Sequence, residues 1–234
     1  MEHVLIVLFR LSAMVAFLPV FGERTVPARV KLAIAVSLTL LVFPLVTPTS
    51  GLTMAAIFTE IATGAFFGIL MRLMVIALQI AGSIAAQSTS LAQLFGGGAS
   101  EPMPAIGHFL VVSGLALLAL GDFHLRLIQS ILMTYEIFPI GQFIGAVVLL
   151  DIGLSVITQT FSVGFSLAAP FVIASLLYNF MLGAINKAMP QLMVALVGAP
   201  AITFLGIILL FLAAPLMLES WLQTVVSVMT LETF

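Results

Sequence analysis

Long apolar segments separated by short polar turns run through the whole chain. Several long stretches carry no charged side chain, among them Leu32 to Thr59, Ile152 to Asn186 and Ala188 to Leu218. Each of them is longer than the roughly 20 residues with which an α-helix crosses a bilayer. The period-two alternation of a membrane β-barrel is absent, and helices satisfy their own backbone hydrogen bonds in lipid. The pattern therefore predicts an all-α protein.

Turn residues and charges divide this pattern into about six kinked helical segments arranged as hairpins. We expect helices at about Val4 to Phe21, Val30 to Val46, Thr53 to Ser90, Pro104 to Leu120, Phe123 to Phe138 and Phe143 to Leu218. The last segment should contain at least two hairpin arms, because its prolines each kink or end a helix. These prolines are Pro170, Pro190, Pro200 and Pro215. We predict a single domain, residues 1–234, without a separate soluble module.

Two pairs of glycines have the small-xxx-small spacing that lets helices approach closely. They are Gly64 with Gly68, and Gly141 with Gly145. Close backbone approach is a common device for packing helices where lipid removes the hydrophobic driving force between them. We therefore interpret both pairs as candidate helix contacts.

Composition indicates an integral membrane or membrane-complex protein. Apolar residues make up 62% of the 234 positions, and the mean hydropathy is +1.32. One soluble core could not hide so much apolar surface. The net charge of -2 argues against binding to nucleic acid, and the absence of cysteine excludes disulfides and thiolate metal sites. We interpret the first segment as a retained helix, because Met1-Glu2-His3 is not basic and Arg10 interrupts the apolar run.

The turn from Glu23 to Lys31 is the most charged part of the chain. Four of its residues are charged, namely Glu23, Arg24, Arg29 and Lys31, whereas charged residues make up only 7% of all positions. Basic residues are retained on the cytoplasmic side of membranes, and the next turns carry none. We therefore expect this turn to face the cytoplasm and to dock a partner.

A second group of charges lies inside or beside the apolar segments. We predict buried ionic pairing for Glu60, Arg72, Asp122, Arg126, Glu136 and Lys187. Asp122 and Arg126 are four residues apart and can pair on one helix face, with His124 alongside. The groups either pair structurally, with each other or with neighbouring subunits, or form a proton relay.

A catalytic function has little support in the sequence. No two of His3, His108 and His124 have the spacing of a helical metal pair, and no glycine-rich loop leads into a lysine. We therefore expect no catalytic, cofactor or metal site.

The loop from Ala92 to Pro104 combines bulky and flexible residues. Leu94 and Phe95 precede Gly96, Gly97 and Gly98, and Met103 lies near the exit. A mobile loop that carries large apolar groups suits a pore constriction that excludes water by dewetting. The same sequence also fits an ordinary exposed turn.

Four stretches together resemble the FliR/SctT family of the type III export apparatus. They are Glu23 to Lys31, Leu94 to Gly98 before Met103-Pro104, Phe138 to Gly141, and Leu182 to Leu192. The last stretch, Leu-Gly-Ala-Ile-Asn-Lys-Ala-Met-Pro-Gln-Leu, is the most specific, and the order and spacing of all four match the family. Lys187 stands where the family has arginine, and Gly121-Asp122-Phe123-His124 stands where Phe-Asn-Gly-His is usual.

The resemblance implies a core subunit of the flagellar protein export gate in the bacterial inner membrane, within the basal body. Such a subunit is similar to a FliP-like hairpin fused to a FliQ-like hairpin. It assembles with FliP-like and FliQ-like subunits, meets FlhB-like and FlhA-like proteins, and passes unfolded substrates. The resemblance also implies a plug at Leu91 to Pro104, and it favours the pore interpretation of that loop.

Two alternatives come from other functional classes. An ion-coupled secondary transporter would use Asp122, Glu60 and the histidines, and it would show an inverted internal repeat; no such repeat is visible in the sequence. A purely structural membrane scaffold would have the same helices without a conducting path.

Overall fold

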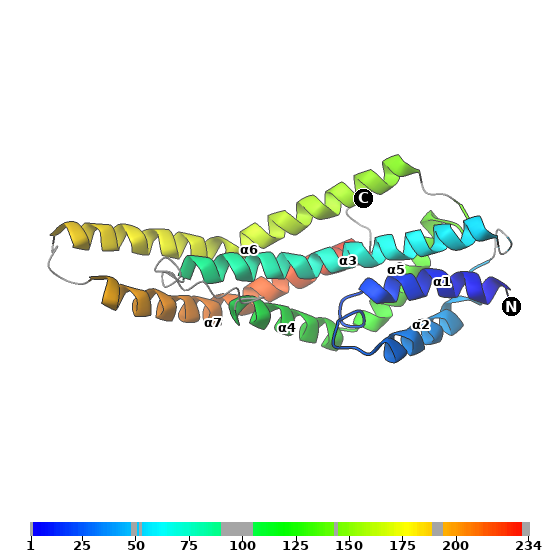
Figure 1. Ribbon diagram of the computed structural model, residues 1–234, viewed down its shortest axis with the longest axis horizontal. Coiled ribbons are helices and arrows are strands. Elements are labelled where there is room, and N and C mark those ends of the chain that lie inside the picture. Colours follow the sequence, from blue (N-terminus) through cyan, green and yellow to red (C-terminus); the bar gives the residue numbers. More distant parts are fainter. Residues whose placement is uncertain are drawn as a thin grey trace. The chain divides into compact units, whose positions relative to one another are not determined.

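The computed structural model describes residues 2–47, 51, 53–89, 105–142, 145–188 and 194–230, and all regular secondary structure in these residues is α-helical (Figure 1). The prediction of an all-α protein is confirmed. The helices are α1 (Glu2–Phe17), α2 (Ala28–Val42), α3 (Met54–Thr89), α4 (Ala105–Leu120), α5 (Phe123–Ile137), α6 (Ala146–Ala188) and α7 (Val194–Met229).

The helix boundaries follow the predicted segments with three differences. Helix α2 ends at Val42 rather than at Val46. Helix α1 ends at Phe17 rather than at Phe21, because Pro19 disfavours helical backbone in the residue before it. The last predicted segment is divided into α6 and α7, and α7 continues to Met229, beyond Leu218. Three prolines lie inside these helices instead of ending them: Pro170 in α6, and Pro200 and Pro215 in α7. Pro190 lies outside the described residues.

The chain forms two compact units that share several helices. Unit 1 comprises residues 1–75, 115–159 and 222–234, and unit 2 comprises residues 76–114 and 160–221. Unit 1 therefore contains α1, α2, α5 and the first part of α3, and unit 2 contains most of α6 and α7. The sequence does not signal this division, because the apolar segments run through it without a polar linker.

In unit 1, α1 packs against α2 and against the glycine-bearing face of α3. Gly64 lies directly against the backbone of Arg10, and a Cβ atom on Gly68 would lie 2.7 Å from the carbonyl oxygen of Met14. The predicted contact at the first glycine pair is thus confirmed. Large apolar residues complete this core, among them Leu11, Met14, Phe67, Met71, Leu127 and Ile131.

The second glycine pair does not pack helices, so that prediction was wrong. Gly141 lies in the connection between α5 and α6 and has a φ of 75°, which a residue with a side chain rarely adopts. A Cβ atom on Gly145 would have no neighbouring atom within 4 Å. Gly141 and Gly145 have the same spacing as the pair in α3, but they do not lie on a helix. Small-xxx-small spacing places residues on one face only within a helix.

In unit 2, the end of α3 packs closely against α4, and α6 is joined to α7. Gly82 of α3 lies against the backbone of Gly107 of α4 so closely that a Cβ atom on Gly82 would overlap it. The Tyr178 hydroxyl of α6 donates a hydrogen bond of 2.6 Å to the carbonyl oxygen of Gly198 in α7. Helices α6 and α7 are therefore the two arms of the predicted hairpin.

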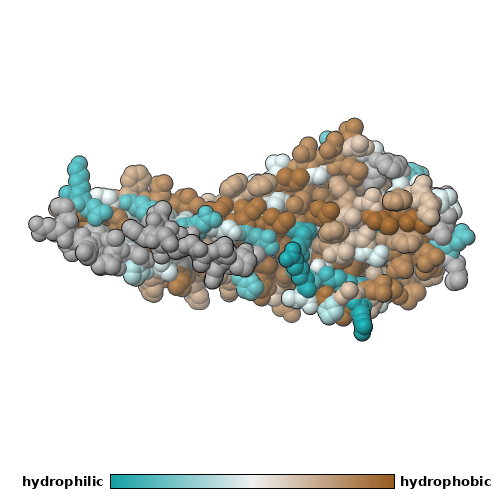
Figure 2. All heavy atoms as spheres, in the orientation of Figure 1, coloured by the Kyte–Doolittle hydropathy of each residue, from teal (hydrophilic) through white to brown (hydrophobic). Residues whose placement is uncertain are grey.

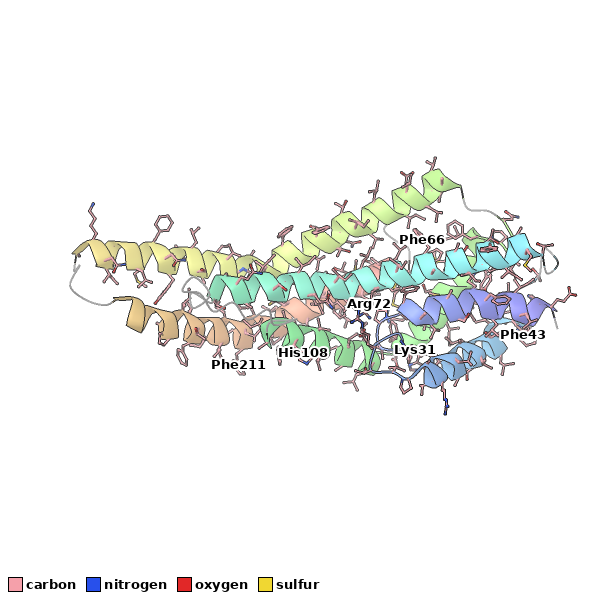
Figure 3. The ribbon with its side chains drawn as sticks, viewed as in Figure 1. Lys31, Phe43, Phe66, Arg72, His108 and Phe211 are labelled. Atoms are coloured by element: carbon pink, nitrogen blue, oxygen red, sulfur yellow. The ribbon has the colours of Figure 1, made fainter. Side chains whose placement is uncertain are left out.

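Within the described residues, three helices are long and apolar enough to span a membrane: α3, α6 and the part of α7 from Pro200 to Met229. A fourth candidate is α4 with α5, which are bent by 79° at the short break between them. In the most apolar stretch of α7 only 28% of residues are buried within the chain. Hydrophobic residues accordingly cover much of the face in Figure 2, and Phe211, which is 81% exposed, points away from α7 in Figure 3.

We predict that Gly64→Ala destabilises unit 1 by about 1–3 kcal/mol, because α1 must move away from α3 to admit the methyl group. The measurement is the thermal unfolding midpoint of the detergent-solubilised protein. Gly183→Ala in α6 is the matched control, since open space surrounds that position and alanine favours a helix interior over glycine. An equal midpoint for Gly64→Ala and the natural protein would contradict the close contact.

Candidate functional site

A buried ion pair between Arg10 and Glu60 lies at the centre of unit 1. The two side chains are 2% and 1% exposed. The Arg10 Nε atom donates to Oε2 of Glu60 at 2.6 Å, and Nη2 donates to Oε1 at 2.9 Å. This bidentate geometry is the strong form of an arginine–carboxylate contact, because two parallel hydrogen bonds are assisted by opposite charges.

The remaining hydrogen bonds of this pair hold the end of α5 and the turn that follows it. Arg10 donates from Nη1 to the carbonyl oxygen of Thr134 at 3.2 Å and from Nη2 to that of Phe138 at 2.9 Å. Glu60 accepts a bond of 3.1 Å from the backbone N–H of Gly141. The Thr134 carbonyl oxygen also accepts from the backbone N–H of Phe138 at 3.0 Å, so Arg10 adds a second hydrogen bond there. It also places its charge at the favourable end of the helix dipole.

Tyr135 covers the guanidinium group of Arg10. The Cζ atom of Arg10 lies 3.9 Å from the centre of the Tyr135 ring, as in a cation–π contact. The Tyr135 hydroxyl is buried and has no hydrogen-bond partner among the described residues. The Tyr135 ring therefore covers one face of the Arg10 guanidinium group and excludes water from it.

The sequence predicted a buried ionic role for Glu60 but did not identify its partner. The sequence prediction includes Arg10 only as an interruption of the first apolar segment. The signal was available, because a single arginine inside an apolar helix requires an acid or backbone carbonyl groups close by. The sequence could not show which acidic residue lies opposite Arg10.

A second ion pair fixes the turn between α1 and α2. Arg72 of α3 donates from Nη1 to Oε1 of Glu23 at 2.6 Å, and both side chains are partly exposed. The Lys31 Nζ atom donates to the carbonyl oxygen of Gly22 at 2.9 Å. Arg72 and Lys31 are labelled in Figure 3. Two of the four predicted docking residues, Glu23 and Lys31, thus hold the turn itself, and Arg24 and Arg29 are exposed.

The other predicted buried ionic residues lie on the surface of the chain. Asp122, Arg126, Glu136 and Lys187 are all exposed. Asp122 and Arg126 do not form an ion pair, although the sequence placed them on one helix face. Asp122 precedes the first residue of α5 in a left-handed conformation with a φ of 58°, so it does not continue the helix that carries Arg126. These four residues are therefore not buried within the chain, and their pairing with neighbouring subunits stays a prediction.

The predicted plug lies outside the described residues. Leu94, Phe95, Gly96, Gly97, Gly98 and Met103 all fall between Thr89 and Ala105, the end of α3 and the start of α4. Within the part of the chain that is described, no three histidine, aspartate or glutamate side chains come together in a way that could hold a metal ion.

Comparison with known proteins gives one consistent result. The model of a family described as bacterial export proteins, family 1, matches residues 1–228. The chain belongs to this family. It is 31% identical over 217 residues to the flagellar biosynthetic protein FliR of Caulobacter vibrioides, with 89% of this chain and 86% of the relative covered. The proteins of the same name from Aquifex aeolicus and Escherichia coli are each 29% identical, over 89% of this chain and 83% of the relative.

The family membership confirms the resemblance that four short stretches carried. The family match covers residues 1–228, which include the buried ion pair, the charged turn and nearly all of the α6–α7 hairpin. The chain is therefore a member of a bacterial export family whose relatives act in flagellar biosynthesis by name, and it carries helices of membrane-spanning length.

We predict that Glu60→Gln destabilises the protein by about 3–5 kcal/mol, because Arg10 then remains buried without a counter-charge. The matched control is Glu136→Gln, which neutralises an exposed carboxylate on α5. The thermal unfolding midpoint in detergent is measured for both variants, and it should decrease by about 6 °C or more for Glu60→Gln. The double variant Arg10→Met with Glu60→Leu should lose less than the sum of the single variants; strict additivity would contradict a coupled pair.

Proposed function

We propose that this chain is a core subunit of the type III flagellar protein export gate, and that it helps form and plug the conduit for unfolded export substrates. The observation that carries the proposal is the match of the export family to residues 1–228, with relatives named as flagellar biosynthetic proteins. We place the chain in the bacterial inner membrane, within the flagellar basal body, and we propose no catalytic activity for it.

The outward faces of the hairpin support an assembled state. In the most apolar stretch of α6 only 33% of residues are buried within the chain, and 28% in that of α7. Exposed phenylalanines occur along both helices, at Phe180, Phe204 and Phe211. A groove of about 410 Å³ in unit 2 is lined only by apolar residues, including Phe109, Leu210 and Pro215. These faces cannot remain in water, and we propose that FliP-like and FliQ-like subunits cover part of them while lipid covers the rest.

The alternative of an ion-coupled transporter is not supported by the buried charges. Such a protein needs a buried carboxyl group that can exchange protons. Among the described residues Glu60 is the only buried carboxyl group, and both its oxygens accept hydrogen bonds. Asp122 and His124, which the transporter hypothesis requires, are exposed. These groups fit a structural role and contact with other subunits.

We further propose two working surfaces. The segment with Leu94, Phe95 and the three glycines that follow acts as the plug, since bulky apolar groups exclude water while glycines allow them to move aside. The turn between α1 and α2 docks FlhB-like or FlhA-like export proteins through Arg24 and Arg29, the two basic residues there that the chain does not use internally.

The assembly is tested by co-purification. A tagged chain, expressed with FliP-like and FliQ-like subunits, should be recovered in detergent as one complex that contains all three. Native mass spectrometry gives the composition. A tagged membrane protein from outside the export apparatus, expressed in the same cells, is the control. Recovery of the chain as a stable single subunit, with the other two absent, would contradict the proposal.

We predict that changing Leu94 and Phe95 to glycine makes the resting complex conduct small ions, because the apolar barrier is lost while the helices remain. Ion conductance of the reconstituted complex is measured beside substrate export. Changing Gly96, Gly97 and Gly98 to alanine is the complementary variant, and it should slow export without leak, since alanine disfavours positive φ. If Leu94 and Phe95 can be replaced without leak in an assembled complex, the seal lies in the partner subunits.

A further inference from the structure

The connection between α1 and α2 and the connection between α4 and α5 come together in unit 1. The ring centroids of Phe21 and Phe123 are 5.8 Å apart. Phe21 lies in the first connection, and Phe123 is the first residue of α5. Helix α2 also contacts α5. Residues that are far apart in the sequence are thereby placed at one end of the same packed group of helices.

Both connections contain a residue with left-handed backbone, and that of Val20 costs free energy. Val20 has a φ of 67° and Asp122 a φ of 58°, and these are the only residues with a side chain at positive φ in the described ranges. The backbone N–H of Phe21 bonds to the carbonyl oxygen of Pro19 at 2.8 Å, so Val20 lies at the centre of a γ-turn of the rare, strained hand. Left-handed backbone is unfavourable for a β-branched residue, and such strain is concentrated at functional sites.

Three contacts keep the strained α1–α2 connection in place. Phe21 packs on Phe123, Glu23 pairs with Arg72 at 2.6 Å, and Lys31 donates to the carbonyl oxygen of Gly22 at 2.9 Å. The turn is thus fixed to α5, α3 and α2. A surface that is already ordered loses little conformational entropy when it binds, which favours recognition of one partner.

Exposed charges lie in both connections and in the first turns of the helices that follow them. Arg24 lies in the first connection and Arg29 in the first turn of α2. Asp122 lies in the second connection, and His124 and Arg126 lie in the first turn of α5; all five are exposed. Three of these residues are arginines and one is an aspartate, and the nearby Glu23 and Arg72 neutralise each other. In Figure 2 hydrophilic residues lie near the place that the start of α2 has in Figure 1, and others lie elsewhere on the same face. Arginine is preferred for such contacts, since its planar group binds a carboxylate with two hydrogen bonds.

The distances suit a short peptide segment. Arg24 lies three residues after Phe21, which is at most about 10 Å of chain, and Arg126 lies three residues after Phe123, about 5 Å along the helix. An extended segment of about eight residues spans about 26 Å. One such segment can therefore contact both arginines at once.

We infer that Arg24, Arg29, Asp122 and Arg126 form one docking surface for an acidic segment of a partner protein. The inference rests on the proposed function and extends it, since that function assigns only the α1–α2 turn to docking. A role in docking explains why Asp122 and Arg126 are exposed and do not pair with each other in the chain. Asp122 repels a segment in which every residue is acidic. It therefore favours a mainly acidic segment that places a basic or neutral residue opposite Asp122.

Site-specific photo-crosslinking in cells that carry the complete export apparatus tests the inference. A photoreactive amino acid replaces Arg24 in one strain and Arg126 in another. The same residue at Lys187, an exposed lysine in unit 2, is the control. We expect Arg24 and Arg126 positions to crosslink to the same polypeptide, at peptides rich in aspartate and glutamate, and position 187 not to reach those peptides.

Charge reversal provides a second, independent measurement. Arg29→Glu should reduce the crosslink yield from position 24 about threefold or more in isolated membranes at low salt, and less at high salt. Lys187→Glu, the matched change elsewhere, should leave it unchanged. Crosslinks from positions 24 and 126 to different polypeptides, to lipid only, to peptides without acidic residues, or to nothing would each overturn the inference.

The crosslinking and co-purification experiments can fail independently of each other. If the chain fails to co-purify with FliP-like and FliQ-like subunits but both positions crosslink to one acidic segment, the docking surface stands and the gate assignment fails. If the three subunits co-purify and the two positions reach different molecules, the gate assignment stands and the shared surface fails.

Discussion

The buried guanidinium group of Arg10 determines how unit 1 is put together. Removing a charge from water is unfavourable by many kcal/mol unless opposite charge and hydrogen bonds replace the solvent. Glu60 of α3 supplies the charge, and two carbonyl groups at the end of α5 supply further acceptors. The same carboxylate holds the backbone of Gly141, which leads into α6. Four parts of the chain are therefore oriented around one side chain, and none can shift without leaving a buried polar group unsatisfied.

The ion pair and the glycine contact of α3 depend on each other. Glu60 and Gly64 are four residues apart and so lie on one face of the helix. Gly64 lets α1 approach until the backbone of Arg10 touches α3, and this brings the guanidinium group within reach of the carboxylate one turn away. A larger residue at position 64 would separate the helices and lengthen the hydrogen bonds. Apolar packing alone would tolerate several rotations of α1, whereas the ion pair permits one.

The few charges of the chain serve two different purposes. Arg10 with Glu60, and Arg72 with Glu23, are used inside the chain to fix helices and a turn. The remaining arginines of unit 1, Arg24, Arg29 and Arg126, stay exposed beside strained connections. The apolar faces of α6 and α7 are likewise left uncovered. Both kinds of surface indicate a protein whose structure is completed by other molecules, as expected for a member of an export family.

The sequence by itself determined the helical class, most helix boundaries, the hairpin of α6 and α7 and the family, because apolar runs, prolines and short motifs are local signals. It also singled out Glu60, since a charge inside an apolar segment is conspicuous. The tertiary structure alone decided that Arg10 is the partner of Glu60, that Arg72 binds Glu23, and that Asp122 and Arg126 are exposed. The physical reason is that an ion pair between residues 50 positions apart depends on how two helices are rotated against each other, and the rotation follows from packing at residues such as Gly64, which no local pattern specifies.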